Sequence, residues 1–175
     1  MSGKRISMIG GAVALTAAAV IGFAALGGPS SARRGVATGP QAPDLPFERF
    51  DGSSATFADY EGRPLVVNFW ASWCPSCVAE MSAAFLPVQQ ALGTDVAFLG
   101  LNLQDDRQDA VRLVDETGVL FDLAEDTRGD LYTALGGLGM PFTVFIDASG
   151  TIVYEHNGPV TEQQLADLIT EHLLS

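Results

Sequence analysis

The segment Trp73–Cys77, with the sequence Trp-Cys-Pro-Ser-Cys, constrains this chain most, because it contains both cysteines of the 175 residues. An apolar run from Leu65 to Trp70 precedes it and favours a strand, and a helix-compatible run from Val78 to Phe85 follows it. The two thiols therefore fall in the first turn of a helix, where side chains three positions apart share one face. Backbone N–H groups without partners and the positive end of the helix dipole favour a thiolate there. We therefore predict a reactive pair in which Cys74, nearest the helix start, has a lowered pKa.

Two other interpretations of the pair are weaker. A structural zinc site needs four ligands, and beyond the cysteines the chain offers only His156 and His172, sixteen residues apart. An inert structural disulfide would close so short a ring that it would constrain the unfolded chain little. The pattern therefore favours a redox-active pair, with Cys74 as the attacking thiol and Cys77 as the resolving thiol. We expect no metal, and no cofactor beyond the Cys74–Cys77 disulfide itself.

The remaining pattern predicts an α/β domain with a central mixed sheet between helices. Pro87 predicts a kink in the helix that follows the cysteines, and Gly118 predicts the end of the next helix. Asp51-Gly52 predicts the turn of an N-terminal hairpin. The expected strands are Phe47–Phe50, Ala55–Phe57, Leu65–Phe69, Asp95–Leu103, Leu120–Leu123, Phe142–Asp147 and Thr151–Glu155, and the expected helices are Pro75–Leu92, Arg107–Thr117, Arg128–Leu135 and Thr161–Leu174.

The N-terminal region predicts export of the domain. After Lys4 and Arg5, residues 6–26 carry no charge, and these twenty-one residues match the roughly 20 that a membrane-spanning helix needs. We expect residues 1–26 to be a membrane anchor with a cytoplasmic N-terminus. The alternative is a signal peptide cleaved near the small residues Ser30–Ala32 and a secreted domain. Residues 27–42, rich in Gly, Pro, Ser and Ala, predict a flexible linker, and residues 43–175 predict one domain.

The predicted domain is strongly acidic. From residue 41 onward the chain has five arginines, no lysine and twenty-one acidic residues, which gives a net charge of −16. This composition excludes a nucleic-acid partner, because it contains no basic stripe. The acidity favours basic client proteins through electrostatic steering, but solubility alone would also account for it.

Several segments in the same order resemble known proteins. The run Val67–Cys77 resembles the active-site segment of thioredoxin-fold proteins, and Gly139–Asp147 resembles their loop with a cis-proline, Pro141 being in that position. Ala42–Phe47, Asp51-Gly52 and Glu80 resemble the membrane-anchored TlpA/ResA group. The resemblance covers about residues 41 to 174. It implies a thioredoxin fold with an N-terminal β-hairpin, and it implies that the section between Asp95 and Leu135 holds the β-α insert of that group.

The resemblance also implies roles for residues around the cysteines. The backbone of Met140, before Pro141, would pair with an extended segment of the client, and Trp73 would form an apolar platform beside Cys74. Asn68 is in the position of the buried aspartate through which thioredoxin relays protons to the inner cysteine, but an amide cannot titrate. Glu80, three residues after Cys77, is the best substitute. The alternative is that Glu80 is an ordinary solvated acid on the helix surface.

These observations predict an exported thiol–disulfide oxidoreductase that exchanges electrons with client cysteines. The resemblance implies a reductase, with a function in cytochrome c maturation and an upstream membrane thiol-redox partner. Pro75-Ser76 between the cysteines resembles neither the Gly-Pro of reducing thioredoxins nor the Glu-Pro common in ResA, so an oxidant that forms disulfides stays an alternative. A Sco-type copper protein would have three residues between its cysteines, and a thiol peroxidase would have its cysteine in a different setting, so both are less favoured.

Overall fold

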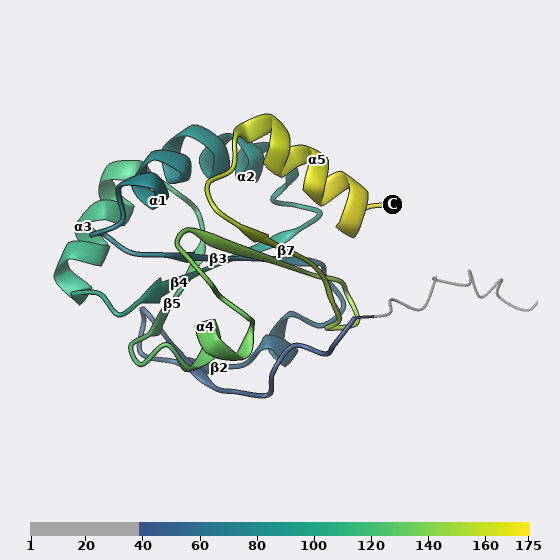
Figure 1. The fold of residues 1–175 in the computed structure, drawn as a ribbon, viewed down its shortest axis with the longest axis horizontal. Helices are drawn as coiled ribbons and strands as arrows, with labels where there is room; N and C mark the ends of the chain where they lie inside the picture. The colour runs from purple at the N-terminus through teal and green to yellow at the C-terminus, as the bar shows by residue number, and fades with distance from the viewer. Residues whose placement is uncertain (1–38) are drawn as a thin grey trace, which may run out of the picture. The chain divides into compact units, whose positions relative to one another are not determined.

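The computed structural model describes residues 39–175. Their centre is a seven-stranded sheet in the order β2-β1-β5-β4-β3-β6-β7 (Figure 1). The neighbours β3–β4 and β4–β5 are parallel, whereas β1–β2, β1–β5, β3–β6 and β6–β7 are antiparallel, so the sheet is mixed as predicted. The strands are β1 (Phe47–Arg49), β2 (Ser54–Ala55), β3 (Leu65–Trp70), β4 (Ala97–Leu103), β5 (Asp122–Asp126), β6 (Phe142–Ile146) and β7 (Ile152–Asn157).

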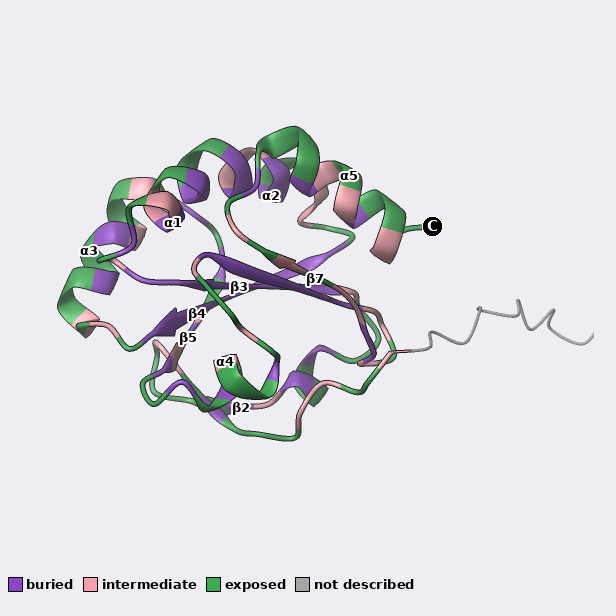
Figure 2. Cartoon of the chain, in the orientation of Figure 1, coloured by how far each residue is buried: buried purple, intermediate pink, exposed green. Residues whose placement is uncertain are grey.

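Helices cover both faces of this sheet, which explains why its central strands are almost wholly apolar. On one face lie α1 (Pro75–Glu80), α2 (Leu86–Leu92), α3 (Arg107–Thr117) and α5 (Glu162–Leu173), as Figure 1 shows. The other face packs against α4 (Asp130–Ala134) and the 3₁₀ helix Phe57–Tyr60. Each face of the sheet has its own hydrophobic core, and β3 contributes residues to both. Val66 and Trp70 belong to the core under α1, α2, α3 and α5, and Val67 and Phe69 belong to the core on the other face. The central strands β3, β4 and β6 are buried throughout, whereas β1, β2, β5 and β7 are partly exposed and the helices alternate between buried and exposed residues (Figure 2).

The long helix after the cysteines is interrupted close to the predicted kink at Pro87. Met81–Phe85 forms a π-helical turn between α1 and α2, in which the backbone N–H of Leu86 donates to the carbonyl of Met81, five residues earlier. Proline has no N–H to donate, and its ring clashes with the carbonyl four residues before it in a regular helix. A widened turn directly before Pro87 accommodates both effects.

Several predicted element bounds differ from the observed ones, and the structure shows the reason for three of them. The strand expected at Leu120–Leu123 is β5, Asp122–Asp126, because Leu120 is 66% exposed and its N–H is bonded to the side chain of Gln89. The strand expected to continue to Phe57 ends at Ala55, where Thr56 and Asp59 form a capping box for the 3₁₀ helix. The helix expected from Arg128 begins at Asp130, since Gly129 precedes it in the left-handed conformation at φ 77°.

The described chain enters the domain beside β7. The N–H of Ile152 donates to the carbonyl of Pro40 at 2.9 Å, and Gln41 forms a β-bridge with Thr151, so the last residues of the predicted linker are held against the domain. The predicted membrane anchor, residues 1–26, lies outside the described residues. Within residues 39–175 no helix is both long enough and apolar enough to cross a membrane.

Candidate active site

The two cysteines lie where β3 ends and α1 begins, and they form a disulfide. Cys74 is the N-cap of α1, and its sulfur accepts a hydrogen bond from the backbone N–H of Cys77 at 3.3 Å. The hydroxyl of Ser76 is 3.5 Å from the same sulfur. Cys74 is 5% exposed and Cys77 is fully buried. A thiolate at Cys74 would therefore have donors already aimed at it, which is the arrangement that lowers a thiol pKa.

A carboxylate from the end of β4 holds the segment before Cys74. Asp105 accepts hydrogen bonds from the backbone N–H and the hydroxyl of Ser72, both at 2.6 Å, and from the side chain of Asn102 at 2.9 Å. Burial opposes the ionisation of Asp105, but these bonds and the N–H of Asp106 outweigh it and hold the pKa of Asp105 below its ordinary value. Asp105 was not predicted from the sequence, although acidic residues at the end of a parallel strand are a signal for a site.

Trp73 projects from the same segment and is 56% exposed, although its indole N–H donates to the carbonyl of Gln104 at 3.2 Å. Its large face is exposed beside Cys74, and its role as a platform for clients stays a prediction. Trp70, in contrast, is fully buried in the core between the sheet and the helices.

A second loop lies at the same end of the sheet, where β3 finishes. Because β3 and β6 are antiparallel and Phe69 pairs with Phe142, the chain leaving β3 and the chain entering β6 are neighbours. This loop contains Met140 and the buried Pro141, joined by a cis peptide bond as the resemblance implies. The adjacent Leu138 is 88% exposed. The end of the sheet where β3 finishes and β6 begins therefore holds the cysteines, Trp73, Met140 and Pro141.

Glu80 is an interior carboxylate, so the alternative of a solvated surface acid was wrong. It is 3% exposed; Oε1 accepts from the side-chain amide of Asn68, and Oε2 accepts from the backbone N–H of Val160, both at 3.0 Å. Burial raises the pKa of Glu80 to about 7, and the two hydrogen bonds only partly oppose that rise. One helical turn after Cys77, this side chain can hold or release a proton near neutral pH.

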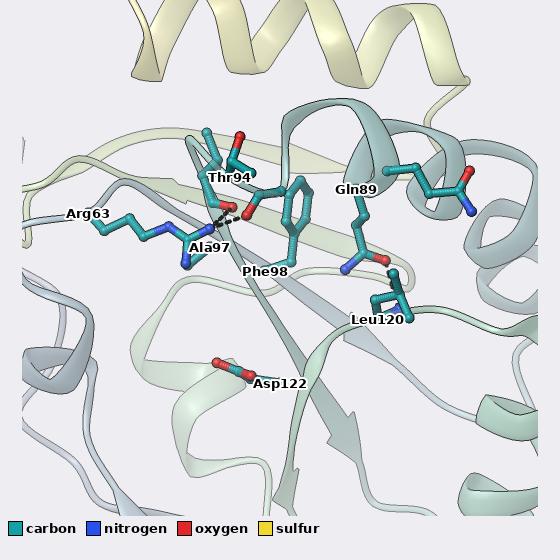
Figure 3. Close-up of a pocket in the computed structure, with 10 residues that line it drawn as sticks. Arg63, Gln89, Thr94, Ala97, Phe98, Leu120 and Asp122 are labelled. Carbon is teal, nitrogen blue, oxygen red and sulfur yellow. Dashed lines mark hydrogen bonds between the residues drawn. The ribbon is translucent and has the colours of Figure 1, made fainter.

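Other candidate sites are poorer. At the opposite end of the sheet a cavity of about 350 Å³ is lined by Arg63, Phe98 and Leu120 among others (Figure 3). Its polar groups are already used by the fold: Arg63 donates to the carbonyls of Gly93 and Val96, and Gln89 accepts from Leu120. Within residues 39–175 no group of three or more His, Cys, Asp and Glu side chains is placed to hold a metal ion.

Comparison with known proteins agrees with this geometry. The model of the Redoxin family matches residues 37–170, which is most of the chain. This chain belongs to the Redoxin family. Its relatives include a thiol:disulfide interchange protein DsbE of Yersinia pestis, 35% identical over 71% of this chain and 66% of that protein. They also include the thiol-disulfide oxidoreductase ResA of Geobacillus thermodenitrificans, 26% identical over 90% of this chain and 88% of that protein.

The predicted resemblance to the TlpA/ResA group is thereby confirmed, and this Redoxin-family chain is of the DsbE/ResA type. Its alignments span about half to two thirds of the length of the DsbE relatives. The predicted fold is confirmed as well. A secreted disulfide oxidoreductase of Mycobacterium tuberculosis has the same fold with a TM-score of 0.66, at 24% identity over 73% of this chain and 96% of that one.

Proposed function

We propose that this protein is an exported thiol–disulfide oxidoreductase that reduces disulfides of client proteins through Cys74 and Cys77. The observation that carries the proposal is the position of the Cys74–Cys77 disulfide. It lies at the N-terminus of α1, at the end of the sheet that also holds Trp73, Met140 and Pro141. The names of the DsbE and ResA relatives support the same chemistry.

The first half of the reaction uses Cys74, the more accessible of the two cysteines. The Cys74 thiolate, stabilised by the N–H of Cys77, attacks one sulfur of a client disulfide. A bond forms between Cys74 and that sulfur, and the client's other sulfur leaves as a thiolate and takes a proton. Trp73 and the backbone beside Met140 hold the client segment, because backbone groups of a loop can form hydrogen bonds with an extended chain.

The second half uses the buried side. The Glu80 carboxylate accepts the proton of the Cys77 thiol, and the Cys77 thiolate then attacks Cys74. The Cys74–Cys77 disulfide forms, and the bond between Cys74 and the client breaks. The client leaves as its second thiolate and takes up a proton, so two electrons and two protons have passed to it. An upstream membrane thiol-redox partner then reduces Cys74–Cys77 again.

We further propose that the domain works outside the cytoplasm, held there by residues 1–26 as a membrane anchor and by the linker 27–42. Its reductase direction and its place in cytochrome c maturation follow from the resemblance to the TlpA/ResA group. Disulfides persist in that compartment, so a dedicated reductase has substrates there.

The experiment that tests the exchange compares two cysteine variants of the full chain. Cys77→Ser should accumulate mixed disulfides with clients, because the resolving attack is lost, whereas Cys74→Ser should accumulate few. Non-reducing gels of cells that express each variant measure the adducts. Equal trapping by both variants would refute the assignment of Cys74 as the attacking thiol, and no trapping by either would refute the proposed function.

A further inference from the structure

Asn68 is a fully buried amide in the middle of the sheet, beside the carboxylate assigned to the proton step. It lies in β3, opposite Gly100 of β4 and Thr143 of β6. Its Nδ2 donates to Oε1 of Glu80 at 3.0 Å and to the hydroxyl oxygen of Thr143 at 3.2 Å. Both amide protons are therefore in use on one side of the group.

The carbonyl oxygen of the same amide is not used within residues 39–175. Oδ1 of Asn68 is buried and has no hydrogen-bond partner among the described residues. A buried acceptor without a donor costs about 1–3 kcal/mol, so an amide with one idle end needs a reason. The observed orientation suits an ionised Glu80, whose two oxygens then accept from Asn68 and from the N–H of Val160.

A protonated Glu80 needs the opposite orientation. The N–H of Val160 faces Oε2, so the proton must sit on Oε1, where it points at Nδ2 of Asn68. Two donors would then face each other. Rotation of the amide by half a turn exchanges Nδ2 and Oδ1, so that Oδ1 accepts from Glu80. The Thr143 hydroxyl can follow, because it accepts from an N–H and donates to a carbonyl equally well.

We propose that the side-chain amide of Asn68 rotates by half a turn when Glu80 is protonated. The Thr143 hydroxyl then changes from accepting a hydrogen bond from Asn68 to donating one to it. This inference rests on the proposed function, in which Glu80 takes the proton of Cys77. Asn68 is then a positioning residue: it offers Glu80 a donor before the transfer and an acceptor after it. One hydrogen bond to Glu80 is kept in both states, so the proton moves without a shift of the backbone.

The titratable groups on the elements around Glu80 take no part in this exchange. On its own helix the titratable neighbours are Cys74 and Cys77, joined as a disulfide in this structure. From the adjacent strands, β3 bonds to Glu80 through the amide of Asn68, and β6 bonds to that amide through the hydroxyl of Thr143; neither side chain is titratable. On α5, which packs against the π turn, three acids are exposed and the fourth titratable group, a histidine, stacks on Tyr154; these residues are Glu162, Asp167, Glu171 and His172. No charged group contributes to the raised pKa of Glu80.

The test is an NMR titration of the full-length protein in its disulfide form, between about pH 5 and pH 9, the range that brackets a raised carboxyl pKa. The Cδ carbon of Glu80 reports its protonation, and the Nδ2 protons of Asn68 report the amide. We expect both to titrate with one midpoint, and we expect the nuclear Overhauser contact between the Asn68 amide protons and Thr143 to be lost below it. An unchanged contact across the Glu80 titration would overturn the proposal, as would a Glu80 that does not titrate in this range.

Variants give an independent measure. Asn68→Leu removes the amide at similar size. Because the rotating amide bonds to both forms of Glu80, its loss should move the Glu80 midpoint by less than about one pKa unit, whereas loss of a fixed donor to the ionised form would raise it by about one unit or more. Thr143→Val is the matched control: it keeps the Asn68 donor and should move the midpoint less. A rise of about one pKa unit or more in Asn68→Leu would mark a fixed donor to the ionised form and would overturn the proposal. These measurements need no client, so they can fail while trapping by Cys77→Ser succeeds, and the reverse.

Discussion

Glu80 is a residue whose burial should be visible in the stability of the whole domain. Its pKa in the folded protein is raised from 4.5 to about 7, chiefly by burial. Between these two pH values the folded protein keeps a proton that the unfolded chain has lost. Stability from this group is therefore fully present below about pH 4.5 and is lost as the pH rises through about 7, and the loss is at most about 3 kcal/mol.

Replacement of Glu80 by Gln should remove this dependence while it keeps the size of the side chain. The free energy of unfolding of the variant minus that of the parent should rise from pH 4.5 to about 7. Urea unfolding of both disulfide-form proteins at a series of pH values measures it. The Gln variant should also change the curve of reduction potential against pH, because in the proposed mechanism the carboxylate and Cys77 would titrate as a pair.

If the potential curves of parent and variant overlay, Glu80 takes no part in the proton step. The parent curve also bears on direction. A value nearer the roughly −270 mV of thioredoxin supports a reductase, whereas one near the roughly −120 mV of DsbA supports the alternative of a disulfide-forming oxidant.

At the scale of elements, the loop before β6 depends on the short helix α4. The hydroxyl of Tyr132 donates to the carbonyl of Gly139 at 3.0 Å, next to Met140. Gly137 lies against the same ring, since a Cβ atom there would be only 2.3 Å from it. The N–H of Leu138 donates to Asn157 of β7 at 3.2 Å. The glycine-rich loop is therefore held from two sides, rather than left free to adjust as its composition alone suggests.

Loss of the Tyr132 hydroxyl should weaken client exchange more than it weakens the fold. In Tyr132→Phe the ring keeps its contacts with Phe69 and Phe142, and the lost hydrogen bond costs about 0.5–1 kcal/mol of stability. We expect a several-fold lower rate with a peptide disulfide, and an unchanged rate with a small disulfide that does not use the loop.

Tyr154→Phe is the control, because the Tyr154 hydroxyl has no hydrogen bond to any residue within 39–175. Equal rates for parent and Tyr132→Phe on the peptide would mean that the bond to Gly139 does not position the loop.

The elements also show what the sequence could predict. The helix Arg107–Thr117 was predicted with its observed bounds, because Asp106 caps its start and Gly118, at φ 70°, ends it. The strand β5 was misplaced because its acids made it look polar, whereas pairing with both β4 and β1 decides its position. The cysteines were identified from local spacing alone. The partners Asp105, Tyr132 and Val160 come from distant parts of the chain, and only the folded sheet brings them to the site.

For the whole molecule, the entry of the described chain and the dithiol lie at opposite ends of the sheet. The described chain enters at the end where β6 finishes and β3 begins, since Leu65 pairs with Ile146 and Gln41 with Thr151 (Figure 1). The dithiol follows the other end of β3, about 20 Å away for a strand of six residues. A domain tethered at its entry point would therefore present the dithiol away from the tether, as a protein that acts on other proteins requires.

The net charge of the domain has a testable consequence for the rate of exchange with charged clients. Residues 41–175 carry a charge of −16, and Asp109 and Glu116 line the hollow beside Trp73 together with Arg112. A field of this sign attracts basic clients and repels acidic ones, and salt weakens both effects as the Debye length falls from about 10 Å at 0.1 M to about 3 Å at 1 M. Exchange with a basic peptide disulfide should therefore slow as salt is added, and exchange with an acidic peptide of the same length should accelerate. Stopped-flow rates, with a neutral peptide as the reference, measure both. If all three peptides respond to salt alike, the acidity serves solubility and does not select clients.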